Sequence, residues 1–305
     1  MDLQEALRGI TCPIVTPFDP DSSANPNERE IDEAAYGDLV DFLLEGGIDG
    51  LFPCGTTGEF ASLAPEERIR LVELTVDRVE RGDRDVPVLA GAAATSVAEA
   101  VSYAEEAADA GADAAVVTPP YFHAANDPDG NRAFFEWVAD RSPLPLLLYN
   151  IPVYTGRRIE PETLEAVAAC ENVIGLKDSS GDLEYFLSAM RRTPDDFLML
   201  QGYDALLVPA LRMGADGGVN ALSNAVPEAY GELYETAGDD RGAQLQDAVS
   251  RLFESCATYG FAPATKTALA HRDVIPSDAV RPPLVEVPDD GRAAIEEAVD
   301  GLLER

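Results

Sequence analysis

Short apolar runs recur along the first 220 residues and alternate with longer segments whose apolar residues follow a helical period. Runs bounded by Gly, Pro, Asp or Asn predict strands, and the amphipathic segments between them predict helices. Eight strands are expected, at residues 10–16, 50–54, 86–91, 114–118, 145–149, 173–177, 197–201 and 217–220. One helix is expected to begin at Asp32, and four further helices are expected at residues 65–80, 97–110, 161–169 and 183–192.

Eight strands that alternate with helices, several of them apolar throughout, are typical of a parallel sheet buried on both faces. We therefore expect an α/β fold, a (β/α)8 TIM barrel over residues 1–226. A doubly wound open sheet is the competitor, but the Gly-x-Gly-x-x-Gly pattern that would follow its first strand is missing. After Asn220 the strand pattern stops, and residues 227–305 predict a C-terminal helical segment packed on the barrel, interrupted at residues 281–284.

The composition limits the kinds of partner that the protein can bind. No apolar stretch approaches the roughly 20 residues that a membrane span needs, and the amino terminus shows no secretory signal. We therefore expect a cytoplasmic protein. The formal net charge of −34 disfavours nucleic acid and anionic membranes as partners. Because the acidic residues are spread along the chain and lysine is rare, we also hypothesise a halophilic protein whose surface is suited to concentrated salt.

Metal and cofactor chemistry find little support. The cysteines, Cys12, Cys54, Cys170 and Cys256, are scattered without a Cys-x-x-Cys spacing, and we interpret them as reduced and packed as small apolar residues. Only two histidines occur, and no phosphate-binding Gly-Lys-Ser/Thr run is present. We therefore expect no metal and no cofactor.

The carboxyl ends of the strands form the active face of a barrel, so the residues that end each strand carry the candidate chemistry. Four ends are unusual: residues 55–59 (Gly-Thr-Thr-Gly-Glu), 119–122 (Pro-Pro-Tyr-Phe), 149–152 (Tyr-Asn-Ile-Pro) and Lys177. Among 22 basic residues only Lys177 and Lys266 are lysines. Desolvation at the end of an apolar strand would lower the pKa of Lys177 and make it a nucleophile for a ketone. A salt bridge to Asp178 or another acid is the equal alternative.

Two further strand ends could assist such a lysine. Tyr149 could move a proton at the substrate oxygen, although a tyrosine in this place is more often a packed residue. The glycines and threonines of residues 55–58 could direct N–H groups and hydroxyls at a carboxylate, although the same residues also make an ordinary turn.

Together these pieces resemble the dihydrodipicolinate synthase and N-acetylneuraminate lyase family of class I, pyruvate-dependent aldolases. The likeness spans nearly the whole chain. It is carried by residues 13–18, 55–59, 118–121, 149–152 with 155–156, 175–178, 214–220 and 281–284.

The resemblance implies a Schiff base between Lys177 and the keto carbon of pyruvate or a 2-keto-3-deoxy acid. It implies that Tyr149 moves the proton, relayed through Thr56 to Tyr121 of a neighbouring subunit, in a homotetramer built as a dimer of dimers. Thr56 would also hold the carboxylate with Thr57. The remaining substrate-binding residues that it implies are Gly55, Tyr154, Val219 and Asn220.

Departures from the family pattern bear on the substrate. Synthases of this family usually carry Arg where this chain has Tyr154, and tyrosine cannot form the bidentate pair that arginine forms with a carboxylate. Residues 178–182 (Asp-Ser-Ser-Gly-Asp) differ from the usual synthase run, and residues 201–204 resemble lyases. Thr95 stands where the lysine-feedback site has Asn. We therefore favour cleavage of 2-keto-3-deoxygluconate or its 6-phosphate, with synthase or dehydratase activity as the runner-up.

A binding or regulatory protein that kept the fold and lost turnover is the third hypothesis. The joint presence of Lys177, Tyr149, Thr56 and Tyr121 disfavours it.

Overall fold

The computed structural model describes residues 2–123 and 127–304, and its centre is one parallel eight-stranded sheet. The strand order is β2-β1-β8-β7-β6-β5-β4-β3, and a parallel bridge between Leu51 and Val88 joins the two ends. The (β/α)8 barrel predicted from the sequence is therefore confirmed. The strands are β1 (Ile10–Cys12), β2 (Gly50–Leu51), β3 (Leu89–Gly91), β4 (Ala114–Val117), β5 (Leu146–Asn150), β6 (Val173–Asp178), β7 (Leu198–Gln201) and β8 (Gly217–Val219).

The first three strands are shorter than expected because of proline. Pro13 follows β1, Pro53 lies two residues after β2, and Pro87 precedes β3. Proline has no N–H to donate to a ladder, so regular pairing stops beside it. Isolated backbone hydrogen bonds hold the two segments together beyond the ends of β1 and β2. They run from Phe52 N to the Cys12 carbonyl at 2.8 Å and from Ile14 N to the Phe52 carbonyl at 3.0 Å.

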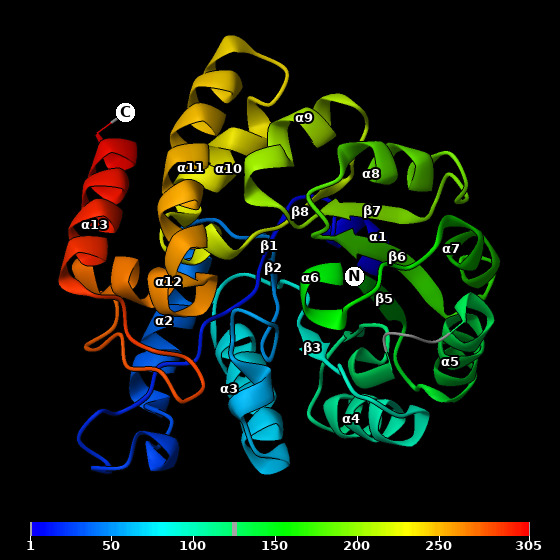
Figure 1. Cartoon of the computed structure of the whole chain (residues 1–305), viewed down its shortest axis with the longest axis horizontal. Helices are drawn as coiled ribbons and strands as arrows, with labels where there is room; N and C mark the ends of the chain where they lie inside the picture. The colour runs from blue at the N-terminus through cyan, green and yellow to red at the C-terminus, as the bar shows by residue number, and fades with distance from the viewer. Residues whose placement is uncertain (1, 124–126, 305) are drawn as a thin grey trace.

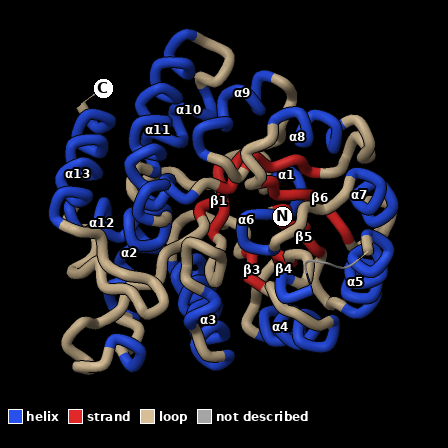
Figure 2. Tube along the Cα trace, viewed as in Figure 1, coloured by secondary structure: helices blue, strands red, loops and turns tan. Residues whose placement is uncertain are grey.

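Helices surround the strands on all sides in Figure 2. Within the described residues the helices of the barrel are α1 (Leu3–Ala6), α2 (Glu33–Glu45), α3 (Pro65–Arg81), α4 (Val97–Asp109), α5 (Pro128–Arg141), α6 (Pro152–Thr155), α7 (Pro161–Val167), α8 (Leu183–Met190) and α9 (Leu207–Arg212). Short 3-10 turns are η1 (Pro26–Glu28), η2 (Phe60–Ser62), η3 (Tyr121–His123), η4 (Asp204–Leu206) and η5 (Ala221–Asn224). Asp32 caps α2 by accepting from Ala35 N at 3.0 Å, which confirms the predicted start.

The barrel has a dry interior and a separate outer core. Leu89, Val116, Leu147, Leu200 and Val219 are among the side chains that fill the interior. Leu7, directly after α1, belongs to the same interior cluster, and Gln4 of α1 donates to the Asp196 carbonyl at 2.8 Å, just before β7. Helix α1 therefore closes the amino-terminal end of the barrel, and the carboxyl-terminal end is its open mouth.

The chain after β8 is helical, with α10 (Pro227–Glu235), α11 (Asp240–Tyr259), α12 (Phe261–His271) and α13 (Asp289–Leu303). Figure 1 shows α11, α12 and α13 together on one side of the barrel. Leu252 and Val299 belong to the same continuous core as the outward side chains of the barrel strands. The domain division after residue 226 stays a prediction. Among the described helices, none combines the length and apolar character that crossing a membrane requires.

Candidate active site

Lys177 lies inside the barrel near the mouth, on β6 between Tyr149 of β5 and Leu200 of β7. Side chains alternate along a strand, and the preceding Leu176 belongs to the outer core, so Lys177 faces inward. The side chain is 3% exposed. Burial lowers the pKa of Lys177 to about 7, although the charge of Asp204 and the Cys12 thiol oppose the shift. The neutral, nucleophilic form of the amine is therefore accessible near neutral pH.

The neighbouring Asp178 faces away from this amine. Its carboxylate accepts from Asn150 Nδ2 at 2.6 Å and from Ser180 Oγ at 2.9 Å. No ion pair joins Lys177 to any carboxylate among the described residues. The alternative of a Lys177–Asp178 salt bridge is therefore wrong, and the amine keeps a lone pair for attack.

Two aromatic rings enclose the amine. Its Nζ lies 4.0 Å from the ring centroid of Tyr149 and 5.1 Å from that of Phe52. Burial raises the pKa of Tyr149 to about 12, and hydrogen bonding to the hydroxyls of Ser179 and Thr56 opposes the rise. Tyr149 therefore keeps its proton at neutral pH and can pass it between these hydroxyls and a bound substrate.

Ser179 was missed by the sequence reasoning. Its Oγ donates to the Gly202 carbonyl at 3.0 Å, which holds the hydroxyl beside Tyr149. The only signal in the sequence was its place two residues after Lys177.

The loop at residues 55–59 is a tight turn that presents unpaired donors. Within the described part of the chain, the N–H groups of Thr56, Thr57 and Gly58 have no hydrogen-bond acceptor. A Cβ on Gly58 would lie 2.7 Å from the Ile14 carbonyl, so only glycine fits there. The Thr16 hydroxyl donates to the Gly58 carbonyl at 2.8 Å and fixes the turn against the end of β1. Such a turn is suited to hold a carboxylate.

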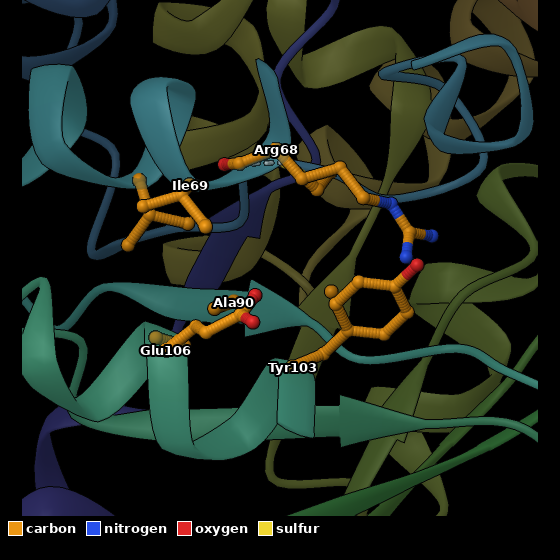
Figure 3. Close-up of a pocket in the computed structure, with 9 residues that line it drawn as sticks. Arg68, Ile69, Ala90, Tyr103 and Glu106 are labelled. Atoms are coloured by element: carbon orange, nitrogen blue, oxygen red, sulfur yellow. Dashed lines mark hydrogen bonds between the residues drawn. The ribbon is translucent and has the colours of Figure 1, made fainter. Parts of the chain in front are cut away.

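The outer side of this loop rests on Arg68 of α3. The guanidinium lies between the rings of Phe60 and Tyr103, at 4.9 Å and 4.2 Å from their centroids. Figure 3 shows the Arg68 guanidinium beside Tyr103. The Cys54 thiol, at the start of the loop, donates to the Arg68 carbonyl at 3.4 Å. A small cavity lined by Arg68, Ile69 and Glu106 lies here (Figure 3).

Two predicted tyrosines lie on the rim. Tyr121, on η3, is 39% exposed and packs edge-on against Phe60 with ring centroids 6.4 Å apart. Tyr154, on α6, is 59% exposed. Among the described residues no hydrogen bond or ring contact joins Tyr121 to Tyr149, so one chain does not complete the predicted proton relay.

The end of β8 contributes one wall residue. Val219 belongs to the interior cluster and is 1% exposed. The Asn220 side chain lies on the opposite side, because its Oδ1 occupies the space where Gly218 would carry a Cβ next to Leu207 of α9. Neither amide atom of Asn220 has a hydrogen-bond partner among the described residues. A substrate-binding role for this side chain is therefore not favoured by its orientation.

A parallel barrel with a buried, unpaired lysine beside a tyrosine of the next strand defines the class of Schiff-base lyases. Residues 6–302 match the model of the dihydrodipicolinate synthetase family, and the chain belongs to that family. It is therefore a carbon–carbon lyase that acts through a lysine–pyruvate Schiff base.

Relatives support the assignment over nearly the full length. The chain is 35% identical to a 4-hydroxy-tetrahydrodipicolinate synthase of Natronomonas pharaonis, with 98% of each chain covered. It is 36% identical to an uncharacterised DapA-like lyase of Halobacterium salinarum, over 95% of this chain and 92% of the other. The crystal structure of YagE, a dihydrodipicolinic acid synthase family protein from E. coli K12 in complex with pyruvate, superposes with a TM-score of 0.88. That pair is 29% identical, and 97% of this chain and 98% of YagE are covered.

Proposed function

We propose that Lys177 forms the Schiff base with the keto carbon of pyruvate or a 2-keto-3-deoxy acid. The observation that carries this proposal is the buried amine itself, which has no carboxylate partner and a pKa lowered to about 7. The neutral amine attacks the ketone, Tyr149 gives its proton to the departing oxygen, which leaves as water, and a protonated imine and a tyrosinate remain. The carboxylate of the same substrate lies on the N–H groups of Thr56 and Thr57, beside the wall formed by Val219 and Gly55.

Tyr149 performs the proton transfers. In the cleavage direction the tyrosinate oxygen accepts the proton of the C4 hydroxyl, while the C3–C4 bond breaks and the electrons of that bond form an enamine on Lys177. The aldehyde leaves and Tyr149 protonates the enamine at C3. Water then hydrolyses the imine, which releases pyruvate and returns the proton to Tyr149. The Thr56 hydroxyl, which interacts with Tyr149, connects it to the proposed proton relay towards Tyr121.

For the substrate we propose 2-keto-3-deoxygluconate or its 6-phosphate. Support comes from Tyr154, which stands on the rim where an arginine would be needed to pair with a second carboxylate. A phenol can hydrogen-bond a hydroxyl of a sugar chain but cannot neutralise an anion.

The second candidate is 4-hydroxy-tetrahydrodipicolinate synthase, which joins pyruvate to aspartate semialdehyde. The observation that favours it is the description of several relatives, including the one from Natronomonas pharaonis, as such synthases.

Incubation with 2-keto-3-deoxygluconate, with its 6-phosphate, and with pyruvate plus aspartate semialdehyde separates these candidates. Fast condensation of the semialdehyde without cleavage of either sugar acid would contradict our choice. Borohydride reduction in the presence of pyruvate tests the shared step. A mass unchanged by reduction would leave only a binding or regulatory protein.

We also propose that the protein is a homotetramer, a dimer of dimers in which Tyr121 reaches the site of a neighbouring subunit. Support comes from the exposed apolar side chains on η3 and α6, with Phe122 at 83% and Val153 at 77% exposed. Burying such side chains between subunits is favourable. Sedimentation that gives a monomer of full activity would contradict this proposal.

A further inference from the structure

The second lysine of the chain lies in a buried ion pair at the end of the carboxylate-binding loop. Lys266 of α12 and Glu59 are both fully buried, and Nζ donates to Glu59 Oε1 and, at 2.8 Å, to the Ala279 carbonyl. The other carboxylate oxygen accepts from Arg281 N at 3.3 Å. The pair therefore joins the C-terminal helices to the loop that carries Thr56 and Thr57.

A second set of contacts surrounds this pair. Arg281 forms a bidentate pair with Glu67 of α3, at 2.7 Å and 2.8 Å, and donates to the Ser62 carbonyl at 3.1 Å. The Phe18 ring contacts both cations, with Lys266 Nζ at 4.3 Å and Arg281 Cζ at 4.4 Å from its centroid. Glu59 at the end of the loop and Ser62 just after it are thus both held by the same cluster, which consists of Lys266, Arg281, Glu67 and Phe18.

The backbone held by this cluster is strained. Cys54 and Glu59 have φ angles of +58° and +57°, so left-handed residues other than glycine stand at both ends of the turn. A left-handed conformation is energetically unfavourable for a residue that carries a Cβ. Strain of this kind persists only where the surrounding structure enforces it. Between the two residues lie the three N–H groups that have no acceptor among the described residues.

The ion pair itself contributes little net stability that an apolar pair could not supply, because desolvation of the two charges offsets their attraction. What it adds is direction, since the Glu59 carboxylate meets both Nζ and Arg281 N while its backbone stands in the left-handed region. We propose that Lys266 and Glu59 are positioning residues, which hold the loop of Thr56 and Thr57 in the conformation that binds the substrate carboxylate. This inference rests on the proposed pyruvate reaction.

The test removes both charges together, in Lys266→Met/Glu59→Gln, because loss of one partner alone would leave an uncompensated buried charge. Arg272→Met is the matched control, since Arg272 follows α12, pairs with Glu228 at 2.8 Å and lies over Phe42, without contact to the loop. Each protein is reduced with borohydride over a range of pyruvate concentrations, and the adduct is measured by intact mass. We expect the half-saturating pyruvate concentration to rise at least about ten-fold in the double variant, with full adduct at saturation. In Arg272→Met it should stay within about two-fold of the wild type, whatever the loss in melting temperature.

The two proposals fail differently. Absence of any adduct in the wild type would overturn the proposed function. An adduct in the wild type together with an unchanged half-saturating concentration in the double variant would overturn only the positioning role. Should the double variant not fold, Lys266→Gln/Glu59→Gln takes its place, because two amides leave no buried charge and can still hydrogen-bond each other. Collapse of both variants would assign the pair to stability alone and would equally overturn the inference.

Discussion

Tyr149 and Lys177 are direct partners in the register of β5 and β6, and the lysine amine lies 4.0 Å from the centre of the tyrosine ring. The residues before and after each of them on the strand are buried as well. The distance between the proposed nucleophile and the proposed proton carrier is therefore set by sheet pairing and does not depend on a loop. Four predictions follow from this arrangement and from the charge of the chain.

Replacement of Lys177 by Arg should abolish the borohydride adduct with pyruvate while the protein stays folded. The guanidinium keeps its proton at neutral pH and cannot attack a carbonyl. Mass spectrometry with peptide mapping is the measurement, and circular dichroism checks the fold. Because Lys266 is then the sole lysine, an adduct that persists on residue 266 would show that the nucleophile has been assigned wrongly.

Lys177→Met should stabilise the protein at pH 7. Burial lowers the pKa of Lys177 from 10.5 to about 7, so the unfolded chain binds more protons between these values and wild-type stability rises with pH there. The cost of burying the charge is fully present below pH 7 and disappears towards pH 10.5. Removing it should add on the order of 4 kcal/mol to the free energy of unfolding at pH 7.

Urea denaturation at pH 7 and pH 10 measures this effect, and the gain should shrink at the higher pH. A variant that unfolds more easily than the wild type at pH 7 would contradict a desolvated, unpaired amine.

Tyr149→Phe should lower kcat for the preferred substrate about 100-fold or more, because no other buried phenol can transfer the proton at the reacting oxygen. KM should change less, since the carboxylate-binding loop is untouched. Tyr185→Phe is the matched control, as its buried hydroxyl donates to the Ile159 carbonyl at 2.8 Å on the outer side of β6. Equal losses of kcat in the two variants would remove Tyr149 from the mechanism.

Salt should stabilise the protein. A net charge of −34 repels itself, and the Debye length falls from about 10 Å at 0.1 M to about 3 Å at 1 M salt. We expect the melting temperature to rise from low to molar salt by a similar amount in NaCl and KCl, because screening depends on ionic strength. A flat melting temperature over this range would refute the halophilic hypothesis.

Local pattern revealed the barrel and the strand that carries Lys177, because apolar strands and amphipathic helices differ in period over short windows. The lengths of the first strands were overestimated, since Pro13 and Pro53 interrupt pairing inside runs that look continuous in composition. The sequence alone did not show whether the Lys177 amine is paired with a carboxylate. That depends on the alternation of side chains along β6, which turns Asp178 outward towards Asn150.

Contacts between residues that are far apart in the sequence could not be predicted from local pattern. Glu59 and Lys266 are 207 positions apart, and only the closed barrel with its appended helices brings them together. The outward orientation of Asn220 likewise depends on the approach of α9 to Gly218.

The closed amino-terminal end of the barrel bears on the order in which the products leave. Leu7 seals the end opposite the mouth, so substrates and products share one passage. In the proposed reaction the pyruvate half of the substrate is attached deepest, at Lys177, and the aldehyde half lies between it and the passage. We therefore expect the aldehyde to depart first and pyruvate last, and free pyruvate to compete with the next substrate molecule for the empty enzyme.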